Sequence, residues 1–321
     1  MTQPLSKFTT IRVGGVPSAI RVAKTRDELI ECAKDIWETG EDWLVLGGGS
    51  NVVINDEPEG LFVIKVENKG IERVAQGHLR VQAGEIWDDL VAYAVTHGLG
   101  GLESLSGIPG TVGAAPVQNI GAYGQELADT FVRCEFFDYE TGELQTLEKA
   151  DLEFGYRDSV LKRGKQGIVT WVEFQLLADL PAGSTELMKS RRIEVLELRA
   201  SKGMLLNEGD YDTHSCGSFF TNPIVSAQFA RTLPEDAPKW DVDEDGDRVK
   251  LSAAWLIEHS GIQKGLRLGA SKAGVSTKHA LAITNRGGAT AKDVLELARF
   301  IQERVAATFG INLAPEPVIV Y

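Results

Sequence analysis

The chain has few cysteines, no long apolar run and a deficit of positive charge. Its 321 residues include 3 cysteines, and Cys32, Cys134 and Cys216 stand far apart in the sequence. That spacing supports neither a disulfide framework nor a zinc site, and it suits a reducing compartment. No stretch approaches the ~20 apolar residues that span a bilayer, and the N-terminus lacks the apolar core of a secretory signal. We therefore expect a cytoplasmic protein that holds no metal.

Acidic residues outnumber basic ones, 46 against 33, which gives a net charge of −13. This balance argues against nucleic acid or an anionic membrane as a partner. An anionic substrate must therefore be met by a local group of Arg and Lys side chains. The apolar fraction of 43% is sufficient for more than one core, and the length suggests two or three domains. The acidic run 241–247 fails the spacing of a calcium loop and is interpreted as a solvated loop.

The residues from Ser106 to Gly124 carry no charge, and glycine stands at 107, 110, 113, 121 and 124. Glycine and proline disfavour both helix and strand, so the stretch predicts a loop. Its bare backbone N–H groups allow an anion or a planar ring to approach closely. A long Gly-rich surface loop is the alternative, although such loops usually carry charge.

A second glycine cluster follows the predicted strand 42–46, as Gly47-Gly48-Gly49-Ser50-Asn51. A strand that runs into glycines is a common way to build a phosphate cradle. No Gly-Lys-Ser/Thr follows, so the cluster is not a P-loop, and Val52 stands where a Rossmann fingerprint needs glycine. A hairpin turn would explain the cluster equally well. Two uncharged Gly-rich loops in one chain favour a dinucleotide held by backbone groups.

Hydrophobic spacing predicts an α+β protein without regular strand–helix alternation. Helices are expected over residues 26–37, 85–96, 185–200 and 255–259, and from 290 onward, where Thr290 and Asp293 form a capping box. Strands are expected over 61–66, 169–177 and 315–321, with a hairpin over 131–147 that turns at 141–143.

Three polar residues are candidates for chemistry. Arg157 could bind a planar carboxylate through two N–H donors, or it could pair with Asp158 at the surface. Ser218 precedes two aromatic residues, where a hydroxyl is either a turn residue or a proton donor to a strong base such as a carbanion. Glu316 lies between two prolines, which fits either a protected edge strand or a rigidly aimed acid.

Four further basic residues are weaker candidates. Arg199 and Lys202 close a helix that ends at Gly203, where the helix dipole alone explains two cations. Lys264 and His279 could contact phosphate or sugar, although isolated residues of these types are usually exposed or structural.

Taken together, these segments resemble the UDP-N-acetylenolpyruvoylglucosamine reductase (MurB) family, the flavoenzymes of bacterial cell-wall precursor synthesis. The matching segments are 9–15, 46–51, 106–124, 155–159, 217–223, 254–265 and 315–317, which span nearly the whole chain. The resemblance implies an α+β fold, with an FAD-binding domain of the vanillyl-alcohol-oxidase-like (PCMH) type in two subdomains and an α+β C-terminal substrate-binding domain. It implies three parts. The first is residues 1–66, joined by a last strand over 311–321, the second is residues 67–205, and the third is residues 206–310.

The resemblance also implies an activity. Such an enzyme reduces UDP-N-acetylglucosamine enolpyruvate to UDP-N-acetylmuramate with FAD and NADPH, and so serves peptidoglycan synthesis, cell-wall biogenesis, cell shape and cell division. Hydride would pass from flavin N5 to C3 of the enol ether, and Ser218 would protonate C2. The implied partners are this substrate and NADPH, and the implied oligomeric state is a monomer.

Site residues follow by the same resemblance. Arg157, Ser218 and Glu316 would be catalytic, with Arg157 and Glu316 binding the enolpyruvyl carboxylate and stabilising its developing charge. The implied FAD-binding residues are Gly47, Gly48, Gly49, Ser50, Asn51, Pro109, Gly110, Gly113, Ala114, Asn119, Ile120, Gly121, Tyr123, Arg199 and Lys202. The implied substrate-binding residues are Tyr156, Asn222, Lys264 and His279.

One departure from the family and two rival functions stand beside this interpretation. Members with the Ser-Phe-Phe-x-Asn-Pro motif often carry an inserted loop whose tyrosine closes over the UDP group, whereas residues 172–218 hold no such insert and only Tyr211. An FAD oxidase of the same fold would predict rapid reoxidation by oxygen and no need for NADPH. A UDP-sugar-binding protein without chemistry would be expected to lack Arg157, Ser218 or Glu316, and all three are present.

Overall fold

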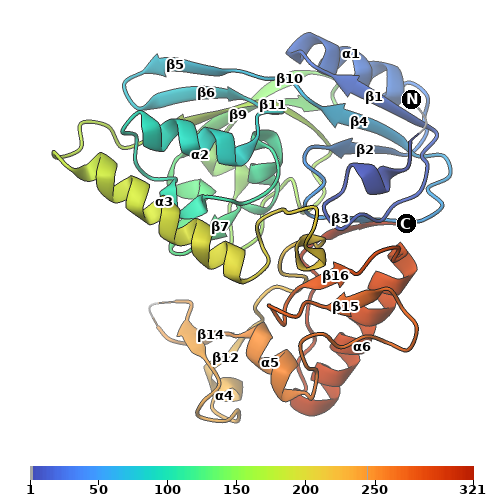
Figure 1. Cartoon of the computed structure of the whole chain (residues 1–321). Helices are drawn as coiled ribbons and strands as arrows, with labels where there is room; N and C mark the ends of the chain where they lie inside the picture. The colour runs from blue at the N-terminus through green and yellow to red at the C-terminus, as the bar shows by residue number, and fades with distance from the viewer. Residues whose placement is uncertain (1–2, 244) are drawn as a thin grey trace. The chain divides into compact units, whose positions relative to one another are not determined.

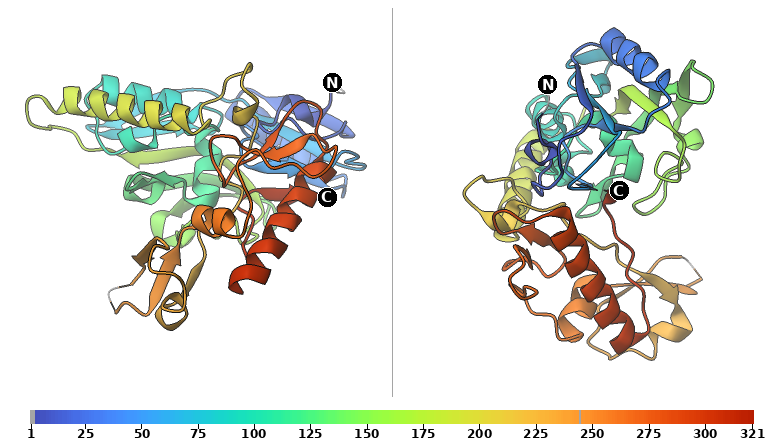
Figure 2. Two further views of the ribbon diagram at one scale, coloured as in Figure 1. Left: turned by 60° about the horizontal axis from the view of Figure 1, so that its bottom comes forward. Right: turned by 90° about the vertical axis from the view of Figure 1, so that its right-hand side faces the viewer.

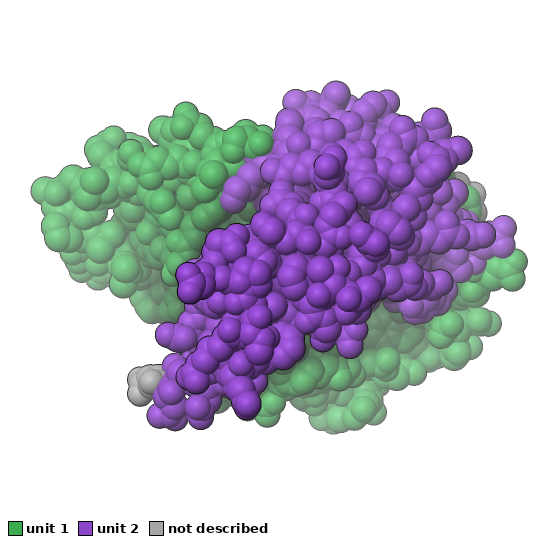
Figure 3. Space-filling view, turned by 90° about the horizontal axis from the view of Figure 1, so that it is seen from below, with its two compact units in different colours: residues 1–4, 16–49, 58–201 green, residues 5–15, 50–57, 202–321 purple. Residues whose placement is uncertain are grey.

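The computed structural model describes residues 3–243 and 245–321, which form two compact units (Figure 3). Unit 1 comprises the described residues of 1–4, 16–49 and 58–201, and unit 2 comprises those of 5–15, 50–57 and 202–321. The predicted division into three parts, 1–66 with 311–321, 67–205 and 206–310, remains a prediction.

Unit 1 contains a parallel sheet in the order β1 (Ala19–Ala23), β4 (Phe62–Val66) and β2 (Trp43–Leu46) (Figure 1). The predicted helix over 26–37 is confirmed as α1 (Arg26–Trp37), which connects β1 to β2. Its N-terminus is capped by Thr25, whose hydroxyl accepts a hydrogen bond of 3.1 Å from the Glu28 N–H. The helix satisfies the need for a crossover between parallel strands.

An antiparallel sheet in unit 1 has the order β10 (Leu144–Glu148), β9 (Phe131–Asp138), β11 (Gly167–Gln175), β6 (His78–Gln82) and β5 (Ile71–Ala75). The predicted hairpin is confirmed as β9 and β10, with Leu144 opposite Phe137. Its turn is held by Asp138, whose Oδ1 accepts hydrogen bonds from the backbone N–H groups of Glu140 and Thr141. The strand predicted over 169–177 is β11, which begins two residues earlier.

Helix α2 (Trp87–Thr96) packs on one face of this sheet, and α3 (Ser184–Ser201) lies beside α2 (Figures 1 and 2). The buried indole of Trp87 meets Phe174 of β11 with ring centroids 6.1 Å apart. The predicted helix 85–96 starts at Trp87, because the two residues before it pair with the Gly-rich stretch: Ile86 bridges to Thr111, and the Glu85 carbonyl accepts from the Val112 N–H.

The prediction that the Gly-rich stretch contains no helix is wrong, because η3 (Val112–Gln118) is a 3₁₀ helix with Pro116 inside it. Tertiary contacts override the poor propensity of this sequence. The N–H groups of Val112 and Gly113 donate to Glu85 O and Ala83 O, at 2.9 and 2.8 Å, so the helix start is satisfied from outside. The element ends at Asn119, which adopts a left-handed conformation with φ 43°.

Unit 2 builds its sheets from short strands. These are β3 (Val52–Ile54) with β17 (Val318–Val320), parallel; β15 (Ala273–Val275) with β16 (Ile283–Asn285), antiparallel; and β12 (Ile224–Ser226), β14 (Arg248–Leu251) and β13 (Lys239–Asp241) in that order. The last strand is shorter than the predicted 315–321, because Pro315 and Pro317 have no N–H to donate.

The described residues of unit 2 contain three α-helices: α4 (Ala227–Ala230), α5 (Ala253–His259) and α6 (Ala291–Phe309). The predicted capping box of α6 is confirmed, since the Thr290 hydroxyl accepts from the Asp293 N–H at 3.0 Å and Asp293 Oδ2 accepts from the Thr290 N–H at 2.9 Å. The helix buries Val294, Leu297 and Ile301. Within residues 3–243 and 245–321, no helix is both long enough and apolar enough to cross a bilayer.

Candidate cofactor and substrate site

The two Gly-rich loops meet inside unit 1. Gly48 lies so close to Gly110 that a Cβ atom at Gly48 would stand 2.6 Å from the Gly110 Cα. A side chain at Gly47 would collide with the Thr111 hydroxyl. The Lys65 ammonium donates to the Gly47 carbonyl at 2.7 Å, and burial lowers the pKa of Lys65. The glycines are therefore required for close backbone packing, and a cation stands beside the loop.

A cavity opens at this meeting point, within unit 1. Among the predicted cofactor residues, Gly47, Gly113 and Ala114 line it. Apolar side chains, including those of Val169 and Phe136, form much of the remaining wall. The wall thus combines backbone groups with apolar side chains, which suits a planar ring and its attached polar chain.

Arg157 is held against the Gly-rich stretch by three side-chain hydrogen bonds. Its own guanidinium donates to the Gly121 carbonyl at 2.5 Å and lies over the Tyr156 ring, 5.3 Å from the centroid. The Asn119 amide donates to the Gly155 carbonyl at 3.1 Å, and the Ser159 hydroxyl donates to Val117 O at 2.7 Å. Arg157 itself is left-handed, with φ 56°. Such a conformation persists where the surroundings impose it.

Arginines of α3 hold the same stretch, and sequence reasoning missed two of them. Arg192 donates twice to Asp88, at 2.5 and 2.7 Å, while Asp88 accepts from the Gly107 N–H at 2.6 Å. Arg191 donates to the Tyr123 carbonyl at 3.3 Å. The sequence signal for these two arginines was their adjacency, one helical turn before the apolar Val195 of α3.

Arg199 was predicted to bind the cofactor, and the structure places it on the Gly-rich stretch. Its Nε donates to the Gly107 carbonyl at 3.0 Å. Burial lowers the pKa of Arg199, although a hydrogen bond to the Tyr123 side chain opposes that shift. Direct cofactor contact by Arg199 remains a prediction.

Unit 2 brings Ser218 and Glu316 onto paired segments. The Glu316 N–H donates to the Phe219 carbonyl at 2.9 Å, and Phe220 forms an antiparallel bridge with Pro315. Asn51 joins the same group, because its side-chain amide donates to the Glu316 carbonyl at 3.4 Å. Three predicted residues that are far apart in sequence therefore lie in one structural group.

Asn222, predicted to bind substrate, has a structural contact in unit 2. Its side-chain oxygen accepts from the Ala253 N–H at 2.9 Å, at the first residue of α5. This bond satisfies one of the donors that a helix N-terminus leaves unpaired. A substrate contact by Asn222 remains a prediction.

Lys202, Lys264 and His279 form a basic group in unit 2. The pKa of His279 is lowered to about 4 by burial and by the charges of Lys202 and Lys264. The imidazole is therefore neutral at pH 7 and presents one donor and one acceptor, while the lysines supply positive charge. Such a group can bind phosphate oxygens and neutral hydroxyls together.

Comparisons with known proteins agree with this geometry. An FAD-binding domain model matches residues 17–148, and the model of the C-terminal domain of UDP-N-acetylenolpyruvoylglucosamine reductase matches residues 209–320. The fold class is α+β with an FAD-binding domain, and the chain is an FAD-dependent oxidoreductase.

Relatives that match the whole length identify the family. The chain is 46% identical to the UDP-N-acetylenolpyruvoylglucosamine reductase of Leifsonia xyli, over 100% of this chain and 99% of the relative, and 43% identical to that of Mycobacterium tuberculosis H37Rv, over 99% and 94%. The crystal structure of the Thermus caldophilus enzyme (MurB) superimposes with a TM-score of 0.74 at 32% identity, covering 100% of this chain and 98% of that one. The chain belongs to the UDP-N-acetylenolpyruvoylglucosamine reductase (MurB) family.

The residues of unit 1 fit FAD. Gly47 and Gly113 line the cavity without side chains, and Gly113 packs so tightly that an added Cβ would lie 2.5 Å from the Ala83 Cβ. A phosphate chain can be held by such bare N–H groups, and the apolar wall accepts a flat ring. For every predicted cofactor residue, including Gly49, Ser50, Pro109 and Ile120, contact with FAD remains a prediction.

Proposed function

We propose that Arg157, Ser218 and Glu316 carry the reduction of UDP-N-acetylglucosamine enolpyruvate to UDP-N-acetylmuramate, with NADPH as the reductant. Family membership supports this, and one observation in unit 2 carries the assignment of residues. The Glu316 N–H donates to the Phe219 carbonyl at 2.9 Å, so Ser218 and Glu316 stand on directly paired segments. When bound, FAD would supply the hydride transfer from NADPH to C3 of the enol ether.

Ser218 is the proposed proton donor. Hydride addition at C3 leaves negative charge at C2, which is conjugated with the carboxylate. A serine hydroxyl is a very weak acid, so it can protonate only a centre as basic as this carbanion. It lies between Gly217, which has a positive φ of 72°, and the fully buried Phe219. The transfer of one proton to C2 completes the lactyl ether.

Arg157 and Glu316 are the proposed partners of the carboxylate end. The Arg157 guanidinium can give a planar carboxylate two parallel N–H donors and stabilise the charge that grows on it in the transition state. Its left-handed backbone and its bond to Gly121 fix the direction of the side chain before substrate arrives. Tyr156, Asn222, Lys264 and His279 are proposed to place the UDP-sugar.

The test follows the flavin absorbance under anaerobic conditions. NADPH should bleach the flavin band, and UDP-N-acetylglucosamine enolpyruvate should restore it. Ser218→Ala should leave bleaching unchanged and slow recovery by about 10²–10⁴-fold, the usual contribution of a general acid. Thr221→Ala, which removes a hydroxyl three residues away, is the matched control and should behave like the wild type. Normal recovery in Ser218→Ala would remove this residue from the proposed mechanism.

We further propose that the enzyme works as a cytoplasmic monomer, without nucleic acid or membrane as a partner. The net charge of −13 argues against nucleic acid and against an anionic membrane, because both are polyanions. Sedimentation of the FAD-loaded protein tests the monomeric state, and a dimer at micromolar concentration would contradict it.

A further inference from the structure

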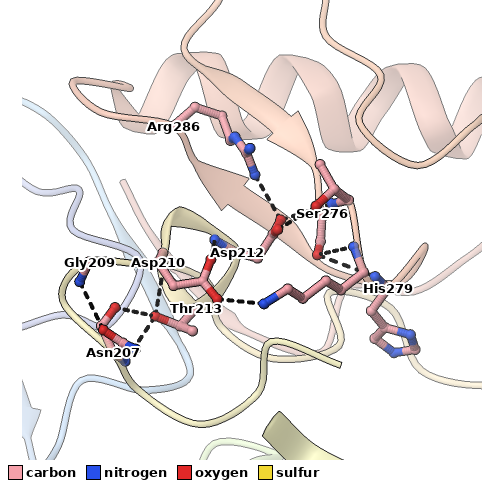
Figure 4. A network of polar contacts seen from close by, with 10 residues as sticks. Asn207, Gly209, Asp210, Asp212, Thr213, Ser276, His279 and Arg286 are labelled. Atoms are coloured by element: carbon pink, nitrogen blue, oxygen red, sulfur yellow. Dashed lines mark hydrogen bonds and ion pairs between the residues drawn. The ribbon is translucent and has the colours of Figure 1, made fainter. Parts of the chain in front are cut away.

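Asp212 lies beneath the basic group of unit 2 and has no assigned role. It belongs to the short 3₁₀ helix η6 (Tyr211–Thr213) and is 5% exposed. A buried carboxylate is costly unless it is paired and hydrogen-bonded. Figure 4 shows that Asp212 faces Arg286 and Ser276, which come from a different part of the chain.

Every contact of the Asp212 carboxylate leads to one turn or to Arg286. Oδ1 accepts from the Thr277 N–H at 2.8 Å and from Arg286 Nη1 at 2.7 Å. Oδ2 accepts from the Thr277 hydroxyl at 2.5 Å. Burial alone would raise the pKa of Asp212, but these hydrogen bonds and the charge of Arg286 lower it. The group is therefore a stable anion.

The same turn carries His279. The fully buried Ser276 oxygen accepts from the backbone N–H groups of Lys278 and His279, at 3.1 and 3.2 Å. Asp212 binds this turn through Thr277, and Ser276, the residue before it, is joined to the backbone of His279. The His279 ring points away from Asp212 (Figure 4). A second bond, of 2.6 Å from the Lys278 ammonium to Asp210, ties the turn to the start of η6.

The two lysines of the basic group are attached to the same place. Lys202 precedes Gly203, which packs against Asp212 so closely that an added Cβ would lie 3.0 Å from the Asp212 Cβ. Lys264 precedes Gly265, whose N–H donates to the Val275 and Ser276 carbonyls at 3.1 and 3.3 Å. All three members of the basic group therefore depend on the position of the turn 276–279.

We propose that Asp212, paired with Arg286, is a positioning residue that fixes the turn 276–279 and so holds Lys202, Lys264 and His279 in register for the diphosphate of the UDP-sugar. This rests on the proposed function, which assigns Lys264 and His279 to the substrate. Two lysines and a neutral imidazole offer charge and hydrogen bonds to phosphate oxygens, and a small displacement of any of them weakens binding without touching the chemistry.

The test compares UDP with uridine, which share the base and sugar and differ in the diphosphate. Calorimetric titration of the FAD-loaded protein should show tighter binding of UDP. Asp212→Asn should weaken UDP binding on the order of tenfold while uridine binding changes little, and should raise KM for the enolpyruvyl substrate more than it lowers kcat. A merely structural role would weaken both ligands alike and would not produce this split.

Two further variants keep the test decisive. Thr277→Val removes one hydrogen bond to Asp212 but keeps the ion pair between Asp212 and Arg286, so it should give a smaller shift in the same direction even where Asp212→Asn folds poorly. Asp56→Asn is the matched control, because Asp56 also accepts backbone N–H groups in unit 2, from Ala291 at 2.9 Å and Lys292 at 3.3 Å, at the start of α6. It should leave the ratio of the affinity for UDP to the affinity for uridine unchanged.

An unchanged ratio in both Asp212→Asn and Thr277→Val would overturn the proposal, as would a wild-type protein that binds UDP no better than uridine. The flavin half-reactions described above separate this failure from failure of the proposed function. Normal half-reactions with no diphosphate preference would reject only the role of Asp212. Absent half-reactions with a shifted ratio would reject the proposed function and support Asp212.

Discussion

The hydroxyl of Ser159 donates a hydrogen bond of 2.7 Å to the carbonyl oxygen of Val117, 42 residues earlier in the chain. Ser159 is fully buried, and the same oxygen accepts from the Leu161 N–H at 3.2 Å. This side chain therefore joins the Arg157 loop to the 3₁₀ helix of the Gly-rich stretch. Two segments with poor intrinsic propensity are ordered by one buried hydroxyl.

Ser159→Ala should destabilise the protein and slow the reduction of the enol ether. Loss of the hydroxyl leaves the partly buried Val117 carbonyl without this donor, which costs about 1–3 kcal/mol. Urea unfolding measures the stability, and flavin recovery measures the reaction. Ser201→Ala is the matched control, because its hydroxyl donates to the Leu198 carbonyl at 2.8 Å on an exposed helix end. Equal losses in the two variants would mean that burial of the Ser159 bond has no special effect.

Gly48→Ala should lose FAD. The new Cβ would lie 2.6 Å from the Gly110 Cα, and backbone on both sides must move to relieve the overlap. Flavin absorbance per protein after gel filtration reports the bound cofactor. Gly209→Ala is the control, because a Cβ there meets only the Asn207 Oδ1, at 3.5 Å. Full flavin content in Gly48→Ala would show that the two loops can separate without harm to the cofactor site.

Asp88→Asn should destabilise unit 1 at neutral pH by about 1–3 kcal/mol, because Arg192 loses its charged partner and the Gly107 N–H loses a strong acceptor. Burial tends to raise the pKa of Asp88, but the hydrogen bonds from Arg192 and Gly107 lower it. A lowered folded-state pKa gives stability that is present above the unfolded pKa of about 3.9 and is lost as the pH falls through the folded value.

The difference in unfolding free energy between wild type and Asp88→Asn should therefore shrink as the pH is lowered from about 5 to about 3. Asp89→Asn, an exposed carboxylate in the same first turn of α2, serves as the control and should change stability little. A difference that stays constant with pH would show that the charge of Asp88 does not stabilise the fold.

The family, the long helices and the catalytic candidates could be predicted from the sequence, because each depends on a local pattern. Thr25 and Thr290 mark their helix starts directly. The pairing of Glu316 with Phe219 could not be predicted, since it joins segments almost a hundred residues apart through backbone groups that every residue has.

Short strands and the partners of charged residues could not be predicted from the sequence either. β5 is mostly exposed along its length and shows no alternation of burial, so no period-2 signal exists for it. Asp212 is one acidic residue among 46 in the sequence, and only the fold reveals that its carboxylate is buried against Arg286. Lys65, which donates to Gly47, was visible only as a single charge within the apolar strand β4.

The stability of His279→Gln relative to the wild type should increase as the pH falls from neutral to mildly acidic. The folded-state pKa of His279 is lowered to about 4, whereas an unfolded histidine titrates near 6.5. Between these values the unfolded chain binds the additional proton, so the wild type loses stability as the pH falls through this window. Because the ring is partly open to solvent, the expected loss is about 1–2 kcal/mol.

Glutamine keeps a donor and an acceptor but takes up no proton, so the unfolding free energy of the variant should decline less from about pH 7 to about pH 4.5. His97→Gln, on an exposed helix end, is the control and should leave the pH dependence of the wild type in place. If urea unfolding gives parallel curves for wild type and His279→Gln across this range, then His279 takes up its proton equally in both states, and the lowered pKa assigned to His279 must be abandoned.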